Sequence, residues 1–109
     1  MAKRFTPAVL AGDPDERAAA AAKRLAELGD ITTRKMFGGV GIFVDAKMFV
    51  ILDKEGGVYF KCDDSNVQRY LDIGSRKHGM PYYQVPAEVW DDDDHVIEWA
   101  RLSADIARS

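Results

Sequence analysis

Residues 40–52 of the chain read VGIFVDAKMFVIL, and this stretch is the strongest indication of the fold. Two runs within it, 40–44 and 47–52, are rich in β-branched and aromatic residues and alternate with the period of two that strands show. The two residues between the runs predict a tight link. The apolar residues Phe43, Phe49 and Ile51 occupy the second face as well. We therefore expect a sheet that is covered on both sides, at least in part, by helices or by a partner chain.

The β pattern extends on both sides of this stretch. It begins at Thr33 and continues into a strand at 58–62, so that three or four antiparallel strands follow one another. A second, shorter β stretch covers roughly 76–85. Pro81 and Pro86 have no N–H to donate to a ladder, which places this stretch at an edge of the sheet or breaks it into short pieces.

Helical signals stand before, between and after these strands. Residues 13–16, DPDE, combine an N-cap, a first-turn proline and a glutamate at the third helical position, which predicts a helix over about 14 to 28. Asp63 or Asp64 can cap a short second helix. The acidic run 91–94 precedes a final amphipathic helix. Helices and strands in this order predict an α+β fold of one domain.

Composition limits the classes of function. The chain has 109 residues and a formal net charge of −3, so its overall charge does not attract nucleic acid. Residues 1–61 hold ten basic and eight acidic side chains, which leaves room for a local basic patch. No secretory signal and no membrane-spanning run is apparent, and the single cysteine, Cys62, cannot form an internal disulfide. We expect a cytoplasmic protein.

Four segments together resemble a known family. They are 34–43 (RKMFGGVGIF), 58–61 (VYFK), 80–86 (MPYYQVP) and the Trp99-Ala100 pair. They are similar to the N-terminal domain of the TfoX/Sxy competence regulators. The resemblance covers about residues 15 to 107, and we take 1–109 as a single domain of this kind with its core at about 13–108. Its motif residues are Met36, Phe37, Gly38, Gly39, Gly41, Pro81 and Pro86.

The resemblance implies a fold like that of the type III secretion chaperones, an α-β(3)-α-β(2)-α arrangement in which helices pack on an antiparallel sheet. It also implies a bacterial regulator of competence genes that works with the transcription machinery. In the two-domain members a helical domain follows, whereas this chain stops at Ser109. A regulatory role that belongs to this second domain therefore cannot be transferred to this chain.

Three groups of residues invite catalytic or ligand-binding interpretations, and each has a structural alternative that we favour. The glycines at 38–41 resemble a phosphate-binding loop, but they lack its lysine and serine, so a turn or bulge explains them better. Cys62 and His78 suggest a thiolate–imidazole pair, but the strand pattern buries Cys62. Residues 91–95, DDDDH, suggest a metal site, but a helix cap and first turn account for them. We expect no catalytic residue, cofactor or metal.

A set of aromatic and cationic residues is the best candidate for a binding site. Tyr59 and Lys61 share one strand face, Arg34 lies on the neighbouring first strand, and Tyr82 and Tyr83 lie near the proline-limited edge. Such mixtures stack bases or grip phosphates, and they also cover small sheets as half-buried side chains.

Three functions compete at this point. The first is a non-enzymatic protein-binding module that recognises an unidentified protein, such as a component of the transcription machinery, through the sheet or its edge. The second is a nucleic-acid-binding domain that uses Arg34, Lys35, Lys61 and Tyr59. The third is an enzyme that uses Cys62 or the acidic run. We favour the first, and we expect that the chain also forms homodimers.

Overall fold

The structure, a computed structural model, describes residues 5–79 and 81–109 and confirms the α+β class. The first run of strands contains four, the larger of the two numbers that the pattern predicts and one more than the three in the arrangement that the resemblance implies. In chain order the elements are α1 (Pro14–Arg24), the 3₁₀ turn η1 (Ala26–Leu28), β1 (Ile31–Met36), β2 (Gly39–Val44), β3 (Lys47–Leu52), β4 (Val58–Lys61), α2 (Val67–Asp72), β5 (Lys77–Gly79), β6 (Tyr82–Gln84), α3 (Ala87–Trp90) and α4 (Asp93–Arg108).

The strands form one antiparallel sheet in the order β1-β2-β3-β4-β6-β5. As the prolines predict, β5 and β6 are short and β5 lies at an edge. Pro81 directly precedes β6 and Pro86 is the N-cap of α3, so the two prolines bracket the strand between them. Met80 of the MPYYQVP segment lies outside the described residues.

Two-residue turns join β1 to β2 and β2 to β3. Phe37 and Gly38 have φ values of 50° and 79°, and Asp45 and Ala46 have φ values of 49° and 70°. Positive φ at both central positions is the requirement of a type I′ turn, whose twist matches that of the flanking strands. The turn predicted at Gly38 and the tight link predicted at 45–46 are confirmed.

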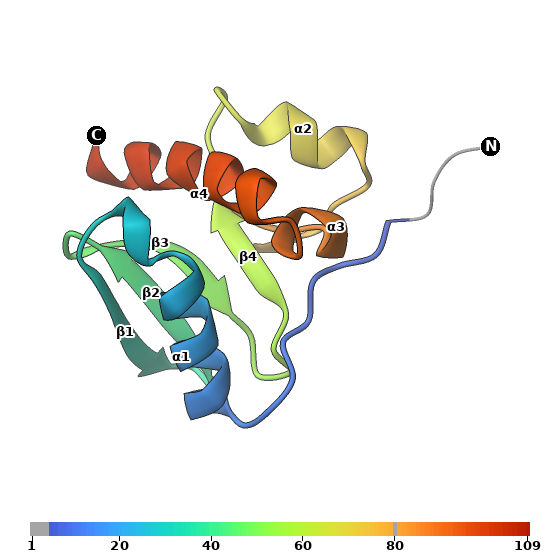
Figure 1. Cartoon of the computed structure of the whole chain (residues 1–109). Helices are drawn as coiled ribbons and strands as arrows, with labels where there is room; N and C mark the ends of the chain where they lie inside the picture. Colours follow the sequence, from blue (N-terminus) through green and yellow to red (C-terminus); the bar gives the residue numbers. More distant parts are fainter. Residues whose placement is uncertain (1–4, 80) are drawn as a thin grey trace.

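The core lies between the sheet and its helices. In Figure 1, α4 crosses the sheet and α1 lies beside β1 and β2. Val40 and Ile42 of β2, Ala21 of α1 and Ala100 of α4 belong to one buried cluster, so both helices cover the same face of the sheet. Alanines on both helices allow this close packing. Among the described residues no helix is long and apolar enough to cross a membrane.

The helices begin as predicted in two cases and differ in the third. Asp13 and Glu16 form the full capping box of α1, and Asp92 accepts hydrogen bonds from two backbone N–H groups at the start of α4. The prediction that Asp63 or Asp64 caps α2 was wrong. The N-cap is Asn66, and the Asp63 carboxylate instead accepts hydrogen bonds from Ser65, which close a turn ahead of the helix.

Two further differences concern helix length. The first helix ends at Arg24, and the chain tightens into η1, which buries both Leu25 and Leu28. The short helix α3 was not predicted. It has four residues, too few to show a helical period.

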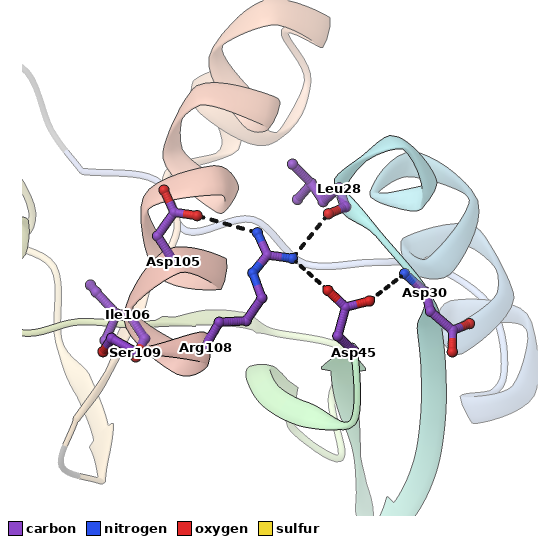
Figure 2. A network of polar contacts seen from close by, with 7 residues as sticks. All are labelled: Leu28, Asp30, Asp45, Asp105, Ile106, Arg108 and Ser109. Carbon is purple, nitrogen blue, oxygen red and sulfur yellow. Dashed lines mark hydrogen bonds and ion pairs between the residues drawn. The ribbon is translucent and has the colours of Figure 1, made fainter.

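An arginine in the last turn of α4 connects three distant parts of the chain (Figure 2). Nη1 of Arg108 lies 2.9 Å from Oδ2 of Asp45 and 3.2 Å from the Leu28 carbonyl oxygen. The other carboxylate oxygen of Asp45 accepts a hydrogen bond from the Asp30 N–H at 3.0 Å. Arg108 therefore ties the end of α4 to the β2–β3 turn and to the chain that enters β1.

This network predicts a pH-dependent contribution to stability. The Asp30 N–H and then Arg108 lower the pKa of Asp45. Asp45 therefore stabilises the fold fully above its ordinary pKa, and the contribution is lost as the pH falls through the lowered value. We expect Asp45→Asn, which suits the left-handed backbone, to lower the urea midpoint at pH 7, and we expect the difference from wild type to shrink towards pH 3.

Asp105→Asn is the matched control, because Asp105 contacts Arg108 only within α4. It should change the midpoint less than Asp45→Asn does. An Asp45→Asn effect of equal size at pH 7 and pH 3 would contradict the role assigned to the charge.

Candidate functional site

The face of the sheet opposite the helices carries a row of side chains that runs across five strands. Arg34 pairs with Gly41, Gly41 with Ile51, Ile51 with Tyr59 and Tyr59 with Gln84. Residues paired in neighbouring strands project to the same side of a sheet. We call this side the open face. Its larger side chains are Arg34, Met36, Phe43, Met48, Ile51, Tyr59, Lys61, Tyr82 and Gln84.

The apolar side chains of the open face are separate from the core. Phe43, Met48 and Ile51 are half-buried, yet among the described residues they neither belong to the buried cluster nor pack against it. The sheet itself separates the two apolar layers. We expected helices or a partner chain to cover both faces, at least in part. Within the described residues, helices cover one face only.

Gly41 shapes the middle of the open face. A Cβ atom at this position would lie 2.8 Å from Cε of Met36 and 2.8 Å from Sδ of Met48. Glycine therefore allows both methionine side chains to lie over β2. Methionine is flexible and polarisable and adapts to differently shaped surfaces. At Gly39 a side chain would collide with the Leu52 carbonyl group, so this second motif glycine permits close approach of β3.

Cationic groups stand beside these apolar groups. The guanidinium carbon of Arg34 lies 5.2 Å from the centroid of the Phe43 ring, within the range of a cation–π interaction. Lys61 is half-buried on β4. Lys35, which follows Arg34, alternates to the helix side, where its ammonium group lies 3.1 Å from Asp15. The basic residues named for nucleic-acid binding therefore divide between the two sides of the sheet.

Tyr59 is held in place from two directions. Its hydroxyl donates to Oδ2 of Asp53 at 3.0 Å, and its ring meets the His78 ring edge-on with centroids 4.9 Å apart. Burial, followed by the bond to Asp53, raises the pKa of Tyr59. The Asp53 carboxylate also accepts from the Gly57 N–H at 2.8 Å and the Glu55 N–H at 3.0 Å. Tyr59 is thus fixed in position and largely buried, and its ring is not free to stack on a base.

The remaining two tyrosines lie on opposite faces. Tyr82 projects from β6 onto the open face, and its hydroxyl donates to the Met48 carbonyl oxygen at 3.3 Å. Tyr83 projects to the helix side, where its ring lies 6.1 Å from that of Tyr70 in α2. The structure therefore places Arg34, Tyr59, Lys61 and Tyr82 on one face and separates Tyr83 from them. The prediction that Arg34 lies on a strand next to that of Tyr59 and Lys61 was wrong, because β2 and β3 lie between β1 and β4.

A hollow of about 370 Å³ lies at the end of the open face where β1 turns into β2. Met36 and Ile51 form part of its wall, and Asp53 and His78 lie across from the turn. Phe37 stands at its rim with its side chain fully exposed. Sequence reasoning placed Phe43, Met48 and Asp53 in no site, and it considered His78 only as a partner of Cys62. The alternation of apolar residues on the second strand face pointed to Phe43 and Ile51. It wrongly placed Phe49 there too, because an irregularity in the β2–β3 pairing leaves Phe49 in the core and Met48 on the open face.

The larger hollow, of about 740 Å³, lies between α1 and α4. Arg24, Glu27 and Asp93 of its lining already have charged partners. Nε of Arg24 donates to the Trp90 carbonyl oxygen at 2.7 Å, and Nη2 lies 3.1 Å from Asp93. These contacts join the two helices, which gives the hollow a structural explanation.

The catalytic alternatives are not assembled by the fold. Cys62 is buried on the helix side at 3% exposure, whereas His78 contacts Tyr59 on the open face, so the sheet separates thiol from imidazole. In the acidic run, Asp92 caps α4 and Asp93 pairs with Arg24. The glycines at 38–41 form the turn and the close approaches described above.

The fold and this surface define an α+β domain with one helix-covered and one open sheet face. The model of the TfoX N-terminal domain family matches residues 23–107, so the chain belongs to that family. Family membership marks it as a domain like that of the competence regulators. Among curated proteins, no sequence matches this chain.

The environment of Cys62 makes its reactivity testable. Burial raises the pKa of the thiol to about 12, and the thiol donates to the Phe60 carbonyl oxygen at 3.6 Å. Only the thiolate is a good nucleophile. We expect iodoacetamide at pH 8 to leave Cys62 unmodified in the native protein and to label it within minutes in guanidinium chloride, as mass spectrometry would show. Rapid labelling of the native protein would refute an inert thiol.

Proposed function

We propose that this domain is a non-enzymatic module that binds another protein through the open face of its sheet. The observation that carries the proposal is the second apolar layer. Phe43, Met48 and Ile51 lie outside the core, and among the described residues no helix covers them. Contiguous apolar surface that the fold does not use for its own core is a mark of an interaction site.

The charges of the open face indicate the chemistry of the partner. Arg34 and Lys61 stand beside the apolar groups, while Asp53, whose carboxylate bonds Tyr59 on this face, is engaged by Tyr59 and by the loop that follows β3. A surface that is apolar and cationic is complementary to a protein that presents apolar side chains together with carboxylates. The partner that we propose is such a protein, and the family suggests the transcription machinery as its source.

The state of the titratable groups supports a binding role over a catalytic one. A general base needs a free lone pair close to a reacting group. Asp53 already accepts three hydrogen bonds, and Cys62 lies on the other side of the sheet. The open face therefore offers shape, apolar area and positive charge.

A charge-matched pair of variants tests the proposal. Arg34→Glu reverses an exposed charge on the open face, and Arg101→Glu makes the same change on an exposed residue of α4. We expect affinity capture from native lysate, quantified by mass spectrometry, to recover a protein with wild type and with Arg101→Glu. Recovery should fall at least tenfold with Arg34→Glu, because the partner's carboxylates would then meet a like charge.

Circular dichroism and urea unfolding of each variant would show that the fold is retained. Equal recovery by both variants would refute the open face as the binding site. Retention of nucleic acid in place of a protein, with affinity that falls steeply as salt is raised, would refute the protein-binding function and favour phosphate contacts.

A further inference from the structure

Phe37 is unusual both in its backbone conformation and in its exposure. It has a φ of 50° at the first central position of a type I′ turn, where asparagine, aspartate or glycine is the favoured residue. Its side chain is 103% exposed, the highest value among the large apolar residues that the structure describes. A bulky residue in a left-handed backbone is strained, and such strain persists where a function needs it.

The neighbouring turn shows how strain of this kind is offset inside the fold. Asp45 has the same backbone conformation, with a φ of 49°, but its carboxylate binds Arg108 and the Asp30 N–H. A fully exposed ring at Phe37 has no comparable compensation among the residues that the structure describes. The sequence therefore gives up turn stability to present an aromatic ring, and this is the pattern expected of a functional residue.

Phe37 is one of the residues that line the hollow, and the hollow is suited to receive an aromatic ring. It has a volume of about 370 Å³, and Met36 and Ile51 supply apolar surface. His78, Lys54 and Glu55 supply polar groups of both signs around it. An aromatic ring buries its whole hydrophobic surface best in a concave site of this kind.

We propose that two copies of the chain pair through this end of the sheet, with Phe37 of each copy in the hollow of the other. Ring and hollow lie side by side on one surface. A two-fold axis between two such surfaces satisfies both contacts together and closes the assembly as a dimer. Lys54 and Glu55 are adjacent at the hollow, so the same axis can bring opposite charges together. This inference concerns a second copy of the chain and is argued independently of the proposed partner of the open face, although Met36 and Ile51 belong to both surfaces.

The size of the contact sets the expected strength. One ring and one hollow on each side form a small interface compared with the roughly 800 Å² per partner of standard stable complexes. The pair should therefore be reversible and depend on concentration. We expect wild-type protein to change from monomer towards dimer as its concentration rises from micromolar to millimolar, as measured by sedimentation velocity.

Phe37→Asn is the decisive variant. It removes the ring and creates Asn-Gly, the favoured sequence for a type I′ turn, so the hairpin should become more stable and the urea midpoint should rise. We expect the dissociation constant of the pair to increase at least tenfold. Leu71→Asn is the matched control, because Leu71 is also an exposed apolar residue, at 49%, and lies on α2 outside the lining of the hollow. It should pair as wild type does.

A mixing experiment tests whether the ring enters this hollow. Ile51→Lys places an ammonium group in the hollow and leaves Phe37 in place. Pairs of Phe37→Asn with itself, or of Ile51→Lys with itself, have no ring-to-hollow contact. A mixed pair retains one, because the ring of the Ile51→Lys copy can enter the hollow of the Phe37→Asn copy, which keeps Met36 and Ile51. We expect the mixture to associate more strongly than either variant alone.

Three results would overturn the proposal: a wild-type chain that stays monomeric at millimolar concentration, pairing that survives Phe37→Asn, or a mixture no stronger than its components. If wild type stays monomeric and Phe37→Asn loses the protein captured from lysate, the ring serves that partner and self-pairing is refuted. Because the capture experiment uses Arg34→Glu, the proposed function can fail or hold independently of this result.

Discussion

The structure depends on the register of β1, β2 and β3, and two turns set that register. Each turn has two residues with positive φ and fixes the alignment of the strands beside it, and an irregularity between Ile42 and Phe43 then shifts the β2–β3 register by one residue. A slip by one residue would move Val40 and Ile42 from the core to the other side and would bury Phe43 under the helices. The separation of the chain into a core face and an open face follows from this constraint.

The two turns meet the same backbone requirement by different means. At 45–46 the cost of the conformation is offset by tertiary contacts, because Arg108 at the far end of the chain binds the Asp45 carboxylate. At 37–38 the glycine accommodates one of the two positions, and the other holds an exposed phenylalanine. The first turn is therefore part of the scaffold, while the second offers a side chain to a neighbouring molecule.

The open face combines features that favour recognition by contact. Its strands are rigid, its methionines adapt to a partner, and Arg34 holds a positive charge against an aromatic ring. Tyr59 and Tyr82 contribute apolar area, while their hydroxyl groups are satisfied by Asp53 and by the Met48 carbonyl group. These polar contacts orient the rings without leaving unpaired groups on the surface.

Local patterns in the sequence predicted the α+β class, the turns at 37–38 and 45–46, the cap of α1 and the burial of Cys62. These are local properties: periodicity reports which face a residue occupies, and capping boxes and two-residue turns depend on neighbours within a few positions. The five predicted site residues came from strand alternation, which grouped Tyr59 with Lys61 but could not show that Tyr83 faces α2.

The face that the helices cover, and the groups that meet across the sheet, could be known from the tertiary structure alone. His78 reaches Tyr59 from an edge strand, and Asp53 reaches it from the preceding loop, contacts that depend on strand order and not on sequence spacing. The same holds for Arg108 and Asp45, which are 63 positions apart. The exposure of Phe37 also depends on the tertiary structure, since the sequence alone does not show whether a given hydrophobic residue will be buried in the core.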